Sequence, residues 1–258
     1  MWRSIAQSLP GPSHVARSSP CQDSHFLNLR GSEPDQTLIA CVADGAGSSK
    51  YGGVGSEVTC QSIAESVDSF LTAGGRLSDL TRDDALRWCA AARARIDEEA
   101  TARGCRARDL ATTLCAAIVA PSSSCFFQIG DGAIVLRRHQ VYGVVFWPQS
   151  GEYANTTNFL TADRFAEQLE FIKTDGCFSD VALMTDGLER LALRFDSRTP
   201  HAPFFDPFFQ ALRSAEDHTG LNAALQEFLE SASVRERSND DKTLLLAAHV
   251  DQSLEDAV

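Results

Sequence analysis

Four apolar segments rich in β-branched and aromatic residues follow one another in the middle of the chain, with only short gaps between them. Each is predicted to be a strand. Strands that alternate with helices indicate a doubly wound parallel sheet, whereas an uninterrupted block of strands favours antiparallel sheets covered by helices. The four segments span residues 111–120, 125–129, 133–138 and 141–146, and further strands are expected at 37–43, 181–185 and 243–250.

Helical patterns lie on either side of this block. The first predicted helix ends before the glycine pair Gly74-Gly75, and the second begins at Thr81, a favourable capping residue. A later helix is expected to begin at Asp206-Pro207 and to carry the aromatic residues that follow. The first and second predicted helices cover about 55–70 and 81–104, and a fourth covers about 221–231.

The length of 258 residues suits one large domain. We therefore predict a single domain over 1–258, with 147–174 as a flap-like excursion from the core and 251–258 as a disordered tail. A hydrophobic content of 43% is typical of a chain that buries a sizeable core. Because no stretch reaches the roughly 18 apolar residues of a membrane span, we expect a soluble, cytoplasmic protein.

The formal net charge of −12 argues against nucleic-acid and membrane partners, because an acidic surface repels both. A phosphorylated substrate therefore needs local positive charge, which bound metal ions can supply. The eight cysteines lack the C-x-x-C spacing of zinc sites, and several lie in apolar runs. We interpret them as small buried hydrophobic residues in a reduced compartment.

Acidic residues stand at the ends of several predicted strands. Any one such step is also typical of a plain turn, because Asp and Gly tolerate left-handed backbone geometry. Together, carboxylates at neighbouring strand ends can converge and bind hard divalent cations, which prefer oxygen ligands and assist phosphoester hydrolysis. The segments are CVADGAGSS with Asp44-Gly45, FQIGDGAIV with Asp131, VALMTDGLE with Asp186-Gly187, SNDDKTLLL with Asp240-Asp241, and PCQDSHF with Asp23.

In this order, VADGAG, IGDG, MTDGL and NDDKT resemble the signature motifs of the PPM family, the type 2C metal-dependent protein serine/threonine phosphatases. GPSH followed by PCQDS, and later PQSGEYANTTNFLT, resemble a bacterial branch of that family. The resemblance extends from about residue 2 to residue 250. It implies an α+β fold, a four-layer α/β/β/α sandwich in which two antiparallel sheets are flanked by helix pairs.

The resemblance also implies a function. Two Mn²⁺ or Mg²⁺ ions, with a weaker third, would lie in a cleft at one end of the sandwich. A hydroxide that bridges two ions would attack the phosphorus of phosphoserine or phosphothreonine directly, without a covalent enzyme intermediate. The expected partners are phosphorylated proteins, the expected role is to oppose a serine/threonine kinase, and the expected state is a monomer.

Roles for individual residues follow from the same resemblance. Asp44 would bridge two ions, and the carbonyl of Gly45 would hold one of them. Asp186 and Asp240 would bind the other ion. Asp240 is preferred to its neighbour Asp241, because the family pattern places Asn at the second position.

Two further aspartates and one arginine complete the implied site. Asp23 would hold metal-bound waters, and Asp131 would contribute to the weaker third site. Many family members carry a phosphate-binding arginine five residues before the first aspartate, where this chain has Ser18. The adjacent Arg17 could grip phosphate instead, because a guanidinium group binds phosphate in a bidentate manner, although a solvated surface role fits it equally.

Two more positions depart from the family pattern. The general-acid histidine of some members is replaced by Ala46, and an aspartate that supports the third ion is replaced by Arg190. His14 and His25 lie near Asp23 in sequence, but each is interpreted as a structural or surface histidine.

Two alternative functions remain open at this stage. A phosphatase fold that binds phosphoproteins without hydrolysing them would fit the missing arginine and histidine. A phosphatase of small metabolites would fit the acidic centre, which acts on any phosphomonoester. Glu152, Tyr153 and Asn155 in the flap-like excursion are candidates for substrate choice, with loop structure as the plainer interpretation.

Overall fold

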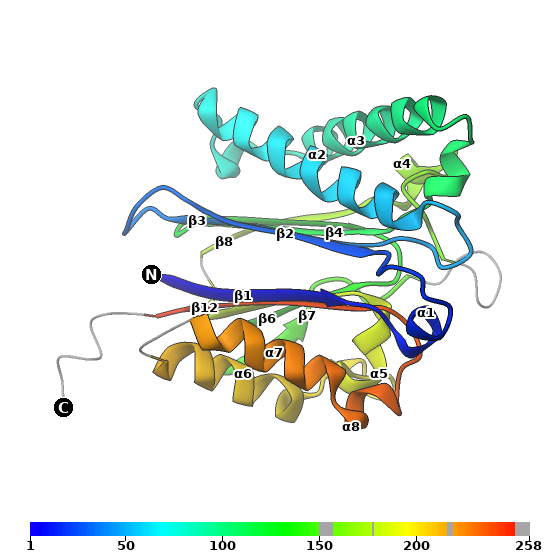
Figure 1. The fold of residues 1–258 in the computed structure, drawn as a ribbon. Helices are drawn as coiled ribbons and strands as arrows, with labels where there is room; N and C mark the ends of the chain where they lie inside the picture. The colour runs from blue at the N-terminus through cyan, green and yellow to red at the C-terminus, as the bar shows by residue number, and fades with distance from the viewer. Residues whose placement is uncertain (150–156, 177, 216–218, 251–258) are drawn as a thin grey trace, which may run out of the picture.

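Two antiparallel sheets lie face to face, and helices cover both outer faces (Figure 1). The computed structural model describes residues 1–149, 157–176, 178–215 and 219–250. The layers therefore run helix, sheet, sheet, helix, which confirms the predicted four-layer α+β sandwich.

Each sheet has five strands, and all neighbouring strands pair in an antiparallel manner. Sheet A consists, in order, of β1 (Trp2–Leu9), β12 (Lys242–His249), β9 (Asp180–Met184), β6 (Ala133–Arg138) and β7 (Val141–Val144). Sheet B consists of β2 (Asp23–Arg30), β3 (Thr37–Asp44), β4 (Leu114–Val119), β5 (Ser123–Ile129) and β8 (Glu170–Asp175).

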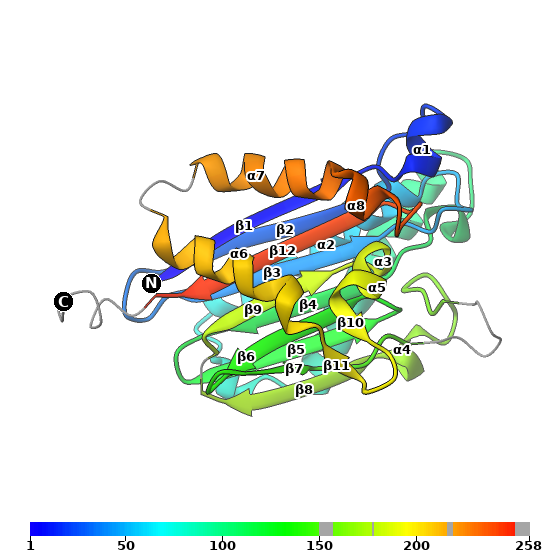
Figure 2. The same cartoon turned by 90° about the horizontal axis from the view of Figure 1, so that it is seen from below.

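Long helices cover the two sheets separately. Helices α2 (Gly52–Thr72) and α3 (Arg82–Ala102) lie on sheet B, whereas α6 (Ala202–Ser214) and α7 (Thr219–Glu230) cross sheet A (Figures 1 and 2). The short elements are α1 (Pro12–Ala16), η1 (Leu77–Asp79), η2 (Ala107–Leu110), α4 (Phe165–Gln168), η3 (Asp186–Leu188), α5 (Glu189–Ala192), β10 (Leu193–Arg194), β11 (Thr199–Pro200) and α8 (Ala232–Arg235).

Three separate apolar clusters fill the spaces between the four layers. One lies between sheet B and its helices, around Trp88 and Phe127. A second lies between the two sheets, around Phe126 and Leu245. The third lies between sheet A and its helices, around Phe205. Neighbouring strand residues alternate between clusters, as Phe126 and Phe127 do, because successive side chains of a strand point to opposite faces.

Most of the predicted elements are present, with shifted ends. The helix cap predicted at Thr81 is confirmed and forms a capping box, since the Thr81 and Asp84 side chains each bond to the other residue's backbone N–H. The helix expected to begin at Asp206-Pro207 was placed too late. It begins at Ala202, and Pro207 lies inside it, because the earlier start brings both Phe204 and Phe205 into the core.

The predicted excursion over 147–174 is corrected in part. Residues 170–174 belong to β8, the edge strand of sheet B, and Leu160 and Leu169 are buried in its outer core. The edge strands β1, β2 and β8 were not among the predicted ranges, because they carry few buried residues and lack a continuous apolar run. The predicted tail, 251–258, lies outside the described residues.

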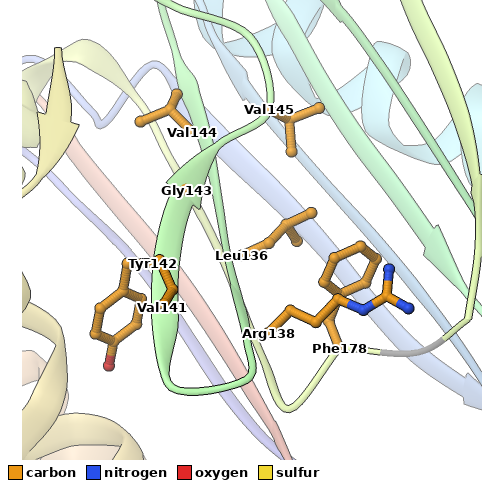
Figure 3. A pocket seen from close by; sticks show the side chains of 8 residues that line it. All are labelled: Leu136, Arg138, Val141, Tyr142, Gly143, Val144, Val145 and Phe178. Carbon is orange, nitrogen blue, oxygen red and sulfur yellow. The ribbon is translucent and has the colours of Figure 1, made fainter.

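A surface pocket of about 290 Å³ lies at the hairpin of β6 and β7 (Figure 3). The guanidinium group of Arg138 lies 5.9 Å from the ring centre of Phe178 at its border. Arg138 is the last residue of β6, seven residues after Asp131, so the pocket lies roughly 20 Å along the strand from the Asp131 turn. Among the described helices, none is both long and apolar enough to cross a membrane.

Candidate metal centre

Three of the predicted aspartates meet where strands of both sheets end. Asp44 is the last residue of β3, Asp131 lies in the turn between β5 and β6, and Asp186 follows β9. Each offers a carboxylate oxygen, and these oxygens all lie within 4.8 Å of one another. The fold therefore brings together residues from three separate sequence motifs, and Asp23 and Asp240 are not members of this group of three.

The glycines beside these aspartates permit close backbone contacts. A Cβ atom on Gly45 would lie 2.2 Å from the backbone carbon of Gly52, at the start of α2. A Cβ atom on Gly187 would lie 1.9 Å from the backbone oxygen of Asp241. These distances exclude a side chain at either position, so the glycines allow the neighbouring chain segments to pack against the aspartate turns.

Asp23, the first residue of β2, joins the two sheets beside this cluster. It pairs with Asp44 in the register of sheet B. Its Oδ2 atom accepts hydrogen bonds from the hydroxyl groups of Thr185 (2.7 Å), which follows β9, and Thr243 (2.9 Å), which lies in β12 of sheet A. The Asp23 side chain is therefore oriented by the same two motifs that supply Asp186 and Asp240.

Asp240 and Asp241 have different environments. Asp240 is exposed, and its charge raises the pKa values of Asp44, Asp131 and Asp186, so it lies close to the cluster. Asp241 is 2% exposed, and both of its carboxylate oxygens already accept hydrogen bonds from protein groups. This arrangement supports the preference for Asp240 as the ligand of the pair.

Burial and mutual repulsion dominate the electrostatics of the cluster. Burial raises the pKa of Asp44 well above its usual range, and the charges of Asp23 and Asp186 add to the shift. Burial and the charge of Asp131 raise the pKa of Asp186 to about 8. Burial raises the pKa of Asp23 to about 7, although the Thr185 hydroxyl opposes the shift. The acids are thus crowded in a way that positive charge would relieve.

Unsatisfied oxygens indicate where that positive charge belongs. The Oδ1 atoms of Asp23, Asp131 and Asp186 are buried and accept no hydrogen bond from any described residue. Among the described residues, no Lys or Arg forms an ion pair with these three aspartates. Buried, unpaired carboxylate oxygens are costly, and a divalent cation is the ligand that several of them together favour. The residues present therefore fit a metal centre.

Asp131 is held by the segment that follows β7. Thr157 donates to Asp131 Oδ2 (2.6 Å). Gln149 forms two hydrogen bonds with Gly130. Its backbone N–H donates to the Gly130 carbonyl (3.2 Å), and its Oε1 accepts from the Gly130 N–H (2.9 Å). This segment orients the Asp131 turn. The three flap candidates Glu152, Tyr153 and Asn155 lie outside the described residues.

The remaining candidates lie in other settings. Arg17 is an exposed residue at the C-terminal cap of α1. His25 bonds through Nδ1 to the Ser8 hydroxyl (2.8 Å), and burial lowers its pKa, which fits a structural histidine. Ala46 is buried. Arg190 is exposed beside Glu189. Burial raises the pKa of Glu189, and the positive charge of Arg190 partly opposes this shift.

Sequence reasoning missed several residues that hold the site. Thr185 and Thr243 lie inside the MTDG and DDKT motifs, so their position next to the aspartates was the available signal. Thr157 and Gln149 lie in a segment without regular periodicity and gave no signal. His14, interpreted as structural, proves to be buried and bonded to Asp241 at 2.6 Å.

Comparisons with known proteins agree with this geometry. The family model of protein phosphatase 2C matches residues 10–230. Serine/threonine-protein phosphatase 3 of Escherichia coli (strain K12) is 37% identical over 249 residues, which cover 95% of this chain and 98% of that protein.

Solved structures share the fold at low sequence identity. The serine/threonine phosphatase Stp1 from Staphylococcus aureus has a TM-score of 0.62 at 15% identity, and 97% of this chain and 96% of that chain are covered. The catalytic domain of the phosphatase PstP, solved in complex with two manganese ions, has a TM-score of 0.61 at 16% identity, with 97% and 99% covered.

Proposed function

The chain belongs to the protein phosphatase 2C family, and we propose that it hydrolyses phosphoserine and phosphothreonine in proteins with the help of divalent cations. The E. coli relative, at 37% identity over almost the full length of both chains, supports this substrate class. The manganese ions of PstP support Mn²⁺ or Mg²⁺ as the cofactor.

One structural observation carries the proposal most directly. Three half-buried carboxylates from both sheets share one site without a compensating lysine or arginine among the described residues. Such an arrangement costs folding free energy, and a site that only binds phosphoproteins gains nothing from added negative charge next to an anionic ligand. A metal-dependent hydrolase needs these groups.

We propose that Asp44, Asp186 and Asp240 hold two ions, together with the carbonyl of Gly45. Asp131 lies within the same group of oxygens and completes the site or holds a weaker third ion. When bound, such ions activate water and neutralise charge on phosphoryl oxygens. The protein's own part is to fix the carboxylates in place through strand ends and the hydroxyl groups of Thr185 and Thr243.

Arg17 is proposed to supply positive charge for the substrate phosphate. It lies on α1, which is bonded to the loop before β12 through Ser13 and Asn239 (3.2 Å between the backbone nitrogen and oxygen). That loop carries Asp240, so Arg17 belongs to the segment beside the metal centre. On the same proposal, the protein opposes a serine/threonine kinase, because it removes the phosphate groups that such a kinase adds.

Hydrolysis of a phosphothreonine peptide with Mn²⁺, with a chelator, and with the Asp44→Asn variant tests the proposal. Turnover by the wild type that both the chelator and the substitution abolish supports it. A wild type that binds Mn²⁺ in calorimetry, yet cleaves neither the peptide nor a small chromogenic phosphoester, would indicate a binding module instead. Preference for sugar phosphates over the peptide would indicate a metabolite phosphatase.

A further inference from the structure

The carboxylate of Asp241 is fully occupied by protein donors. Its Oδ1 atom accepts from the backbone N–H of Gly11 (2.7 Å) and from the His14 ring at Nδ1 (2.6 Å). Its Oδ2 atom accepts from the backbone N–H of Gln22 (2.6 Å). Asp241 is 2% exposed and His14 is 5% exposed, so the whole arrangement is screened from water.

These bonds connect the backbone segments that carry the acids of the metal centre. The Asp241 N–H donates to Oδ1 of Asp240 (2.9 Å), which directly restricts that exposed carboxylate. Gln22 immediately precedes Asp23, and its carbonyl accepts the N–H of Gly45 (3.1 Å). One buried carboxylate thus links the loop before β12 in sheet A to the residues just before β2 and just after β3 in sheet B.

Helix α1 is fastened to the same point. A Cβ atom on Gly11 would lie 2.2 Å from the backbone carbon of Asp240, so the chain passes directly against the loop that carries this aspartate. Figure 1 shows α1 at one end of the sandwich, next to the ends of both sheets. The bonds from Gly11 and His14 to Asp241 hold α1 there.

The chemistry of the donors explains why this position carries an acid. Three N–H groups point at the side chain, and an ionised carboxylate is the side chain that can accept all of them. An amide has a single acceptor oxygen, and its NH₂ group would face one of the N–H donors. A carboxylate that accepts from all three groups takes Nδ1 of His14 as the donor in their bond.

We propose that Asp241 and His14 are positioning residues that set the separation of the metal-binding carboxylates of the two sheets. Neither residue binds the ion or the substrate. Asp241 fixes Asp240 through its own N–H and fixes Asp23 and Gly45 through Gln22, while His14 holds the Asp241 carboxylate in the required rotamer. This inference rests on the proposed function, because it takes the acidic cluster as the metal centre.

Calorimetric titration of the metal-free protein with Mn²⁺ tests the proposal without reference to turnover. Asp241→Asn and His14→Gln are expected to weaken Mn²⁺ binding by about 10-fold or more, as loss of groups that orient metal ligands does in other proteins. Activity on the phosphothreonine peptide should show the same shift in half-saturating Mn²⁺.

Asp180→Asn is the matched control. Asp180 is also a buried acid of sheet A, bonded to Arg137 and Arg213 at the end of β9 away from the cluster. Its loss should lower thermal stability and leave Mn²⁺ binding unchanged. A merely structural role for Asp241 predicts the same pattern for Asp241→Asn, and that result would overturn the proposal.

The second variant covers a failure to fold. If Asp241→Asn does not fold, His14→Gln decides by the same criterion, and unchanged Mn²⁺ binding in it overturns the proposal. A wild type that binds Mn²⁺ but hydrolyses no phosphopeptide would refute the proposed function alone, because the calorimetric comparison of the variants would still stand.

Discussion

The two ends of strand β9 carry acids in opposite circumstances. Asp180 begins the strand and is fully buried, with ion pairs to Arg137 (3.5 Å) and Arg213. Asp186 follows the end of the strand and shares its space with Asp44 and Asp131. Its Oδ1 atom is buried without a hydrogen-bond partner among the described residues.

The difference separates an acid that is paired within the fold from one that we propose to bind a metal ion. At the Asp180 end, two arginines offset the charge, although burial still raises the pKa of that carboxyl. At the Asp186 end, burial and the charges of the neighbouring acids all raise the pKa of Asp186. A chain that can pair a buried acid at one end of a strand, and leaves acids unpaired at the other, keeps that second end for a cation.

The largest expected effect comes from removing a charge at the unpaired end. Asp186→Asn should lower kcat/KM for the phosphothreonine peptide by more than about 100-fold, since loss of a ligand exceeds the effect of losing its orienting partner. Without metal, the same variant should be at least as stable as the wild type, because one repelling charge is gone. Steady-state kinetics and thermal unfolding with a chelator measure the two quantities.

A large fall in the stability of metal-free Asp186→Asn would contradict this interpretation. It would show that Asp186 is held by favourable interactions and that the comparison with Asp180 is misplaced.

The second effect concerns the paired end. Asp180→Asn should lower the free energy of unfolding by about 3 kcal/mol, the lower part of the range for breaking a buried ion pair, because both arginines keep some contact with water. The folded variant should retain its kcat and its half-saturating Mn²⁺. Denaturant unfolding and Mn²⁺-dependent kinetics check these outcomes, and a change in Mn²⁺ dependence would erase the distinction between the two ends.

The last effect is a pH dependence of the metal-free protein. In the folded state the pKa values of Asp23 and Asp186 are raised to about 7 and about 8, from ordinary values near 4. Between these limits the folded chain binds more protons than the unfolded chain, so stability falls as pH rises, by at most about 1.4 kcal/mol per pH unit for each carboxyl.

Unfolding of the chelated protein at pH 5 and pH 8 measures this slope. Asp186→Asn should flatten it, and saturating Mn²⁺ should remove it. A chelated wild type that is more stable at pH 8 than at pH 5 would mean that these acids are not crowded in solution.

Sequence reasoning reached the acids of the site but not their supports. Asp44, Asp131 and Asp186 were found because glycine-rich turns follow apolar strands, and this pattern is visible within ten residues. Thr185 was not singled out, although it bonds Asp23 across the sandwich from 162 positions away. For the same reason, the helix around Pro207 was misplaced: its start depends on which phenylalanines reach the core of sheet A.

Local periodicity and turn chemistry were enough to predict the central block of strands, antiparallel sheets covered by helices and the identity of the acids, because these properties depend on short stretches of chain. The folded molecule was needed to show which acids share one site, that Asp180 is paired while Asp186 is not, and that Asp241 faces His14 instead of the cluster. These relations depend on how the two sheets stack and on the positions of their strand ends, so they connect residues that no local pattern can link.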